Sequence, residues 1–169
     1  VAGLIIGKQC NVNNSNNIKQ PKNVFLNNLY EDVNFVRVTN STYYTVTNKQ
    51  DHDGVVNIEN VYDGLNSKEY RFYSTGNSVE RTIETSLAVS GKANEVLSVT
   101  ALARANLNPT DYLKVQLKFK YKAKYEYEYQ TYEFSFNSND GTEQFNGMNV
   151  LSKYDYDDIS LIIKYTNSD

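Results

Sequence analysis

Apolar and polar residues alternate along much of this chain with a period of two. The clearest run covers residues 113–129, in which every odd position is apolar or aromatic and the even positions between them carry Lys, Gln or Glu. Period two over such a length is typical of a β-strand with two different faces. We therefore predict that the odd-numbered face packs on the core. Its members are Leu113, Val115, Leu117, Phe119, Tyr121, Ala123, Tyr125, Tyr127 and Tyr129.

The run is longer than an ordinary strand, which leaves two interpretations open. It is either one long, bent strand, or it folds back about Lys124 and pairs Lys122 with Glu126. Opposite charges across such a hairpin favour the second interpretation, whereas the lack of Gly or Asn at the turn favours the first. Tyr132, Phe134 and Phe136 then have even parity, which predicts a β-bulge near residue 131.

Shorter runs of strand-forming residues lie between turns rich in Asn, Asp, Gly and Ser. They cover residues 23–26, 33–38, 42–47, 55–62, 69–74 and 158–167. Residues 78–111 fit either a helix or two strands joined by a hairpin turn at residues 90–94, and we favour the strands. Residues 137–147 are expected to form a loop. The sequence thus predicts an all-β fold, an antiparallel β-sandwich of immunoglobulin-like or jelly-roll-like type with an extended N-terminal strand.

Composition narrows the function classes. A chain of 169 residues suits one domain. Its net charge of −3 and its pI near 5.2 argue against a nucleic-acid-binding protein, which is expected to have a basic surface. No apolar run approaches the roughly 20 residues needed to span a bilayer, so we predict no membrane span. Tyr is unusually frequent, with 15 residues, and Trp is absent.

The N-terminus is an uncharged strip, VAGLIIG, followed by a polar, Asn-rich stretch. We divide the chain into a donor-type strand with its tether, residues 1–22, and one sandwich domain, residues 23–169. An apolar strand on an extended tether can complete the open sheet of a neighbouring molecule. The side chains expected to enter that neighbour are Val1, Leu4, Ile5 and Ile6. Pairing of the strip within its own chain is the alternative interpretation.

These features lead to a functional hypothesis. The strip and the β-rich body resemble the design of pilins and other surface-filament subunits, which polymerise by donor-strand exchange. The resemblance implies a non-enzymatic structural subunit that binds other copies of itself head-to-tail, which produces an open filament or a ring. A viral coat subunit is a related alternative. A monomeric glycan- or receptor-binding module is another, with an aromatic platform of Tyr121, Tyr125, Tyr127 and Tyr129.

No catalytic signature accompanies this hypothesis. The single histidine, His52, lies in a charged turn without a nucleophile motif beside it. One His and one Cys cannot supply a zinc site, so we predict no cofactor. Asx-rich turns supply calcium candidates, because Ca²⁺ prefers oxygen ligands. These candidates are Asp51, Asp53, Asn139 and Asp140.

An extracellular or cell-surface location is expected from composition and from a first residue that is not Met, which suggests a removed leader. Asn13 and Asn40 begin the two possible glycosylation sequons, although chance alone predicts at least as many. Cys10 has no partner for an internal disulfide and is either a free thiol or an intermolecular one.

Overall fold

The computed structural model describes the backbone of residues 3–11, 24–31, 44–61, 66–73, 79–138 and 142–166, and the side chains of 44–56, 69–73, 79–138 and 142–166. These residues form β-strands and no helix, and hence no helix that could cross a membrane. The strands are β1 (Gly3–Asn11), β2 (Val24–Glu31), β3 (Thr45–Thr47), β4 (Gly54–Val61), β5 (Asn66–Arg71), β6 (Arg81–Ser86), β7 (Val96–Ala103), β8 (Tyr112–Ala123), β9 (Glu126–Phe136), β10 (Gln144–Leu151) and β11 (Asp158–Thr166).

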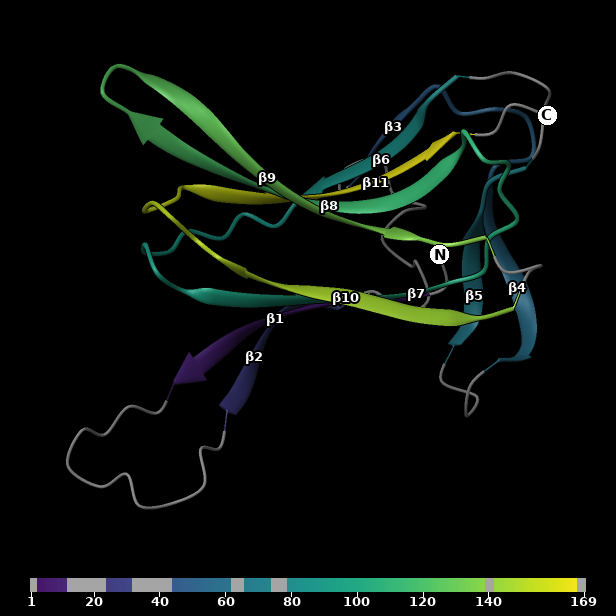
Figure 1. The fold of residues 1–169 in the computed structure, drawn as a ribbon, viewed down its shortest axis with the longest axis horizontal. Helices are drawn as coiled ribbons and strands as arrows, with labels where there is room; N and C mark the ends of the chain where they lie inside the picture. The colour runs from purple at the N-terminus through teal and green to yellow at the C-terminus, as the bar shows by residue number, and fades with distance from the viewer. Residues whose placement is uncertain are drawn as a thin grey trace.

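Two larger sheets and one small one contain these strands (Figure 1). A five-stranded sheet has the order β3-β6-β11-β8-β9, a four-stranded sheet has the order β10-β7-β1-β2, and β4 pairs with β5. Every strand pairing is antiparallel, which confirms the predicted all-β antiparallel class. The choice between an immunoglobulin-like and a jelly-roll-like arrangement stays a prediction.

One hydrophobic core contains residues of both larger sheets, consistent with the predicted sandwich. Alternate residues of each strand enter it, because successive side chains of a strand point to opposite faces. The four-stranded sheet contributes Leu97 and Val99 of β7, both fully buried. The five-stranded sheet contributes Leu117 of β8 and Ile159 of β11.

The ambiguous segment, residues 78–111, forms two strands, β6 and β7, as favoured from the sequence. The predicted hairpin between them is wrong, because β6 pairs with β3 and β11 whereas β7 pairs with β1 and β10. Residues 90–94 therefore connect the two sheets instead of turning within one. The expected loop at residues 137–147 is also too long, since β10 begins at Gln144.

The long alternating run folds back as a hairpin, so the single bent strand is wrong. Ala123 pairs with Glu126, which leaves Lys124 and Tyr125 as a two-residue turn. Lys124 adopts a φ of 32°, the left-handed region that such turns require and that usually selects Gly or Asn. The register differs by one residue from the predicted one, so that Lys122 lies opposite Tyr127 and not opposite Glu126.

This register also explains the change of parity that suggested a β-bulge. The ladder between β8 and β9 runs without a register shift from Leu113–Phe136 to Ala123–Glu126. With a two-residue turn, odd residues of β8 lie opposite even residues of β9 and share their face of the sheet. Tyr132, Phe134 and Phe136 therefore continue the core face from the partner strand, and no bulge is present at residue 131.

The N-terminal strip lies inside its own sheet. β1 pairs with β7 on one side and with β2 on the other, and the β7 ladder places Leu4 opposite Ala101 and Ile6 opposite Val99. Four residues of the predicted tether, 8–11, belong to β1. Pairing within the chain was the alternative interpretation of this strip. Val1 and residues 12–22 of the tether lie outside the described residues.

Candidate functional site

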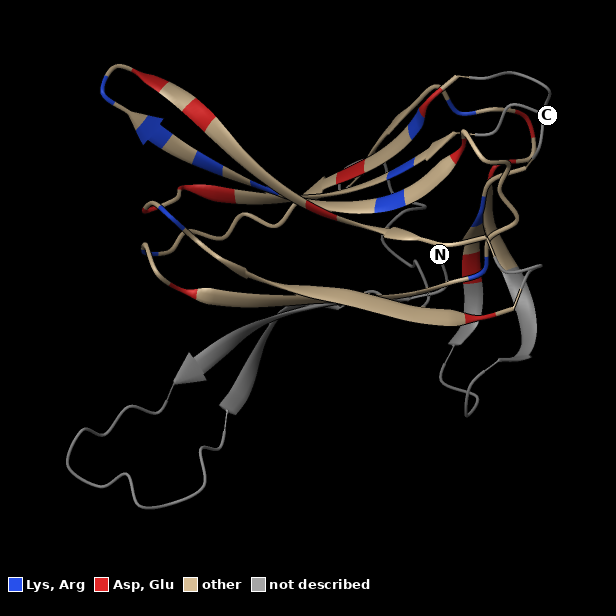
Figure 2. Cartoon of the chain, viewed as in Figure 1, with Lys and Arg blue, Asp and Glu red and all other residues tan. Residues whose placement is uncertain are grey.

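The most distinctive surface is the end of the β8–β9 hairpin, residues 120–130, which we call the ribbon. It projects from the five-stranded sheet beyond the other strands of the body (Figure 1). The charged residues of its two strands differ in sign, because β8 carries Lys and β9 carries Glu (Figure 2). The ladder register sorts these side chains onto two different faces.

One face of the ribbon is basic and aromatic, and we call it the outer face because it continues the side of the sheet away from the core. Lys120 lies opposite Tyr129, and Lys122 lies opposite Tyr127. Tyr127 and Tyr129 are 47% and 54% exposed, and Tyr125 in the turn is 85% exposed. These tyrosines therefore do not enter the core, contrary to the expectation for the odd-numbered face, because the turn reverses the parity.

Lysine ammonium groups cover one side of each exposed ring. The Nζ atom of Lys120 lies 4.2 Å from the centroid of the Tyr127 ring, and that of Lys118 lies 5.1 Å from the Tyr129 ring. The Nζ atom of Lys124 lies 5.3 Å from the centroid of the Tyr125 ring. Each such cation–π contact contributes about 0.5–1 kcal/mol at an exposed site.

The opposite, inner face of the ribbon is acidic. Tyr121 lies opposite Glu128 and donates a hydrogen bond of 2.9 Å to its carboxylate, and this bond raises the pKa of Tyr121. The Tyr121 ring stacks on Tyr154 with a centroid distance of 4.3 Å. The four tyrosines of the predicted platform are therefore divided, because Tyr121 lies on this face and Tyr127 and Tyr129 on the other.

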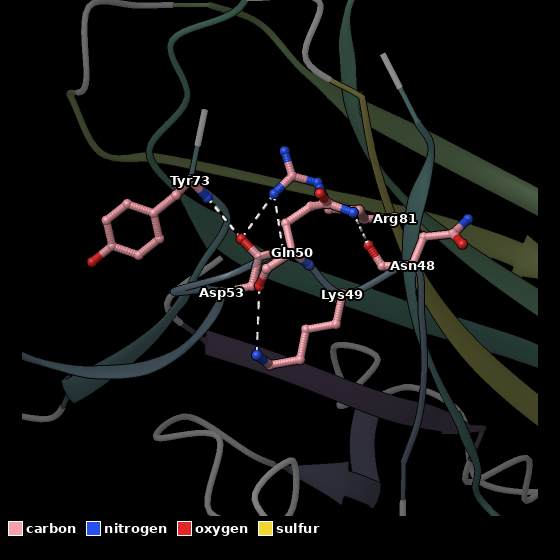
Figure 3. Close-up of polar contacts among 6 residues, drawn as sticks. All are labelled: Asn48, Lys49, Gln50, Asp53, Tyr73 and Arg81. Carbon is pink, nitrogen blue, oxygen red and sulfur yellow. Dashed lines mark hydrogen bonds and ion pairs between the residues drawn. The ribbon is translucent and has the colours of Figure 1, made fainter. Parts of the chain in front are cut away.

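Asp53, one of the calcium candidates, has another partner. Its carboxylate accepts hydrogen bonds from Nη1 of Arg81 at 2.8 and 2.9 Å, and from the backbone N–H groups of Gln50 and Tyr73 (Figure 3). Both charged side chains are 1% exposed. The carboxylate therefore neutralises a buried guanidinium and joins the β3–β4 loop to β6.

The guanidinium of Arg81 is otherwise enclosed by aromatic rings. Its central carbon lies 4.8 Å from the Tyr165 ring centroid and 5.8 Å from that of Phe72. Within the described part of the chain, its buried Nε and Nη2 atoms have no hydrogen-bond partner. Removal of Asp53 would thus leave a buried cation with only ring contacts. The alternation of β6 places Arg81 on the same face as Ile83, but nothing in the sequence signals the partner of this buried arginine.

A second ion pair gives a prediction on acid stability. Glu69 of β5 accepts hydrogen bonds from Arg71 at 2.6 Å and from Arg104 at 2.9 Å. Burial raises the pKa of Glu69, but the two arginines outweigh this effect and hold the pKa below the ordinary value of 4.5. The stabilisation is complete above pH 4.5 and is lost as the pH falls through the folded-state pKa.

We therefore expect Glu69→Gln to lower the free energy of unfolding at neutral pH and to weaken its dependence on pH below 4.5. Urea unfolding of both proteins across the acidic range measures this. The difference between them should shrink as the pH falls, because Glu69 then becomes protonated and neutral like glutamine. Curves that stay parallel down to strong acid would contradict the assignment.

The remaining predicted site residues do not come together. Asp51 and His52 are exposed in the β3–β4 loop, where the His52 ring lies 6.2 Å from that of Tyr73. Cys10 lies in β1 opposite Phe25. Asn13, Asn40, Asn139 and Asp140 lie outside the described residues. Among the residues that the structure describes, no three His, Cys, Asp or Glu side chains are grouped to hold a metal ion.

Comparisons with known proteins identify no relative of this chain, since no family model, no curated protein and no solved structure matches it.

Proposed function

We propose that this protein is a non-enzymatic binding module that recognises a surface receptor or glycan through the ribbon. One observation carries the proposal: three exposed tyrosines gather on a projecting hairpin, and each has a lysine ammonium group beside its ring. Exposed, rigid aromatic side chains are typical of recognition surfaces, because they bury a large area at a small cost in conformational entropy. The extracellular or cell-surface location stays a prediction from composition.

The test replaces the three tyrosines together, as Tyr125→Ser, Tyr127→Ser and Tyr129→Ser. The intact labelled chain is applied to arrays of glycans and of folded extracellular proteins. We expect the triple variant to lose the binding that the unchanged chain shows, by about tenfold or more, since each removed ring costs about 1 kcal/mol or more.

Val46→Ser is the matched control for this experiment. Val46 is also an exposed apolar residue, and it lies on β3, at the opposite edge of the same sheet. This control should bind as the unchanged chain does. Equal binding by the triple variant would overturn the proposal. So would an intact chain that binds nothing on the arrays and only polymerises in sedimentation experiments.

Self-assembly by strand complementation is the second candidate, and it is favoured by one feature of the sheet order. Among the described strands, the β1–β2 hairpin joins its sheet only through the ladder between β1 and β7. If β1 left this position, the β7 backbone at residues 97–102 would become an open edge that a neighbour's β1 fits. Deletion of residues 1–7 separates this candidate from the first.

A further inference from the structure

The ribbon has an unpaired edge as well as two faces. β9 is the last strand of its sheet, and among the described strands it pairs only with β8. Backbone N–H and C=O groups on the outer side of an edge strand form a row of donors and acceptors to which another strand can add. Which residues present these groups follows from two hydrogen bonds.

The first bond is made by β8. The Lys120 carbonyl accepts a hydrogen bond from the backbone N–H of Asp157, so it points toward β11 and away from β9. Its neighbour Tyr121 therefore points its backbone groups toward Glu128 on β9. Even residues of β9 thus bond to β8, and odd residues point outward.

The second hydrogen bond, made by β9, also shows that odd residues of β9 point their backbone groups away from β8. The outward carbonyl of Ser135, an odd residue of β9, accepts a hydrogen bond of 2.7 Å from the Asn146 side chain of β10. β10 also contacts β9 where the Tyr132 hydroxyl donates to the Leu151 carbonyl. β10 therefore covers the half of β9 from residue 132 onward. Tyr127, Tyr129 and Thr131 present their outward backbone groups on the half that no described strand covers.

The side chains beside this edge define which strand would fit. On the inner face, Glu126 and Glu128 are both exposed and lie two residues apart, so that an added strand would place every second side chain beside a carboxylate. On the outer face, the same strand would place its intervening side chains beside Tyr127 and Tyr129. Opposite charges and aromatic–β-branched pairs across neighbouring strands each contribute about 0.2–1 kcal/mol.

We propose that the β9 edge at residues 127–131 binds an extended segment of a partner protein in which basic and apolar residues alternate. This inference rests on the proposed function, because it assigns the partner class of the same ribbon. The backbone ladder supplies affinity, and the two carboxylates select Lys or Arg at alternate positions. Glycan binding, self-pairing of β9 and no binding are the competing outcomes.

The probe is the peptide acetyl-Thr-Lys-Val-Lys-Val-Lys-Thr-amide, and its control replaces every Lys by Glu. Both peptides have the same β-forming pattern, so a difference between them reports charge selection. We expect the full chain to bind the Lys peptide and not the Glu peptide. Amide hydrogen exchange at Tyr129 and Thr131 should slow when the Lys peptide is bound, because their N–H groups enter the new ladder.

A proline at the edge tests the strand addition itself. Tyr129→Pro removes an outward N–H that β8 does not use, and proline is tolerated on an edge strand when its nitrogen faces solvent. We expect about tenfold or greater loss of affinity for the Lys peptide. Tyr129→Val is the matched comparison, because it removes the same ring and keeps the N–H, so it should lose only the contribution of the ring and bind the Lys peptide more tightly than the proline variant does. Circular dichroism of both variants checks that each is folded.

Charge reversal supplies an independent check. In Glu126→Lys the preference for the Lys peptide over the Glu peptide should fall or invert. Equal binding by the proline and valine variants, or binding without slower exchange at Tyr129 and Thr131, would overturn the inference. If the Tyr triple variant still loses array binding, the proposed function stands and only the partner class is wrong.

Discussion

Replacing Asp53 by alanine is expected to lower the free energy of unfolding by about 3–5 kcal/mol, because it leaves a buried cation without its counter-charge. Arg81 has no route to water, since its side chain is 1% exposed. Two of its nitrogens already have no hydrogen-bond partner among the described residues, so the ring contacts of Tyr165 and Phe72 cannot replace the carboxylate. Urea unfolding at neutral pH measures the loss.

An exposed ion pair is the control for this prediction. Lys92 and Asp155 lie 3.7 Å apart, with side chains 81% and 68% exposed. Lys92→Ala should change stability by at most about 1 kcal/mol, because water screens such pairs. A similar small effect for Asp53→Ala would mean that water enters the Arg81 site. Arg81→Met, in contrast, should cost less than Asp53→Ala, because the Asp53 carboxylate keeps the backbone N–H groups of Gln50 and Tyr73 as hydrogen-bond donors.

Strand-forming patterns in the sequence predicted the elements better than their partners. The strand-forming run at residues 158–167 and the alternation at residues 113–123 correspond to β11 and β8, since each strand buries side chains in the core. β10 was missed because its sequence, QFNGMNVL, alternates with Asn and Gly instead of charged residues. The hairpin expected between β6 and β7 failed for a different reason, since a turn sequence does not say whether the next strand stays in the same sheet.

The change of parity after residue 129 was visible in the sequence, but its attribution to a β-bulge is wrong. Buried Phe136, with partly buried Tyr132 and Phe134, has a parity opposite to the core residues of β8. A two-residue turn at Lys124 produces this change, and a bulge does not have to be added. The correct register would have placed Tyr127 and Tyr129 opposite lysines on the outer face. The stacking of Tyr121 on Tyr154 could not be foreseen, because it joins segments far apart in the sequence.

The buried pair of Arg81 and Asp53 could not be predicted from the sequence. Asp53 lies in a turn of charged residues, which ordinarily indicates exposure, and the calcium interpretation followed from that assumption. Its burial depends on strands β5 and β6, which meet the loop only in the folded chain: Tyr73 follows β5, and Arg81 begins β6. A long-range contact of two polar residues leaves no periodic pattern.

Deleting residues 1–7 is the change with the largest expected effect, and it separates the two ways in which the N-terminal strip can act. The β1–β7 ladder begins at Gly3 and pairs residues 3–8 with the backbone of residues 97–102. If β1 belongs to its own sheet, the deletion leaves that backbone edge unpaired beside Leu97 and Val99, which are fully buried. We expect the truncated chain to lose most of a domain's usual stability, about 5–15 kcal/mol, and to aggregate through the open edge.

A peptide with the sequence of residues 1–11, added to the truncated chain, should restore the cooperative thermal transition, whereas a scrambled peptide should not. Sedimentation of the intact and the truncated chain distinguishes a filament subunit from a binding module. A subunit that donates this strand to a neighbour would polymerise when intact and stay folded and monomeric when truncated. A binding module would be monomeric when intact and would need the strip to fold, because β1 then stands between β7 and β2 of the same molecule. A truncated chain that melts like the intact one would show that the strip is not required by its own sheet.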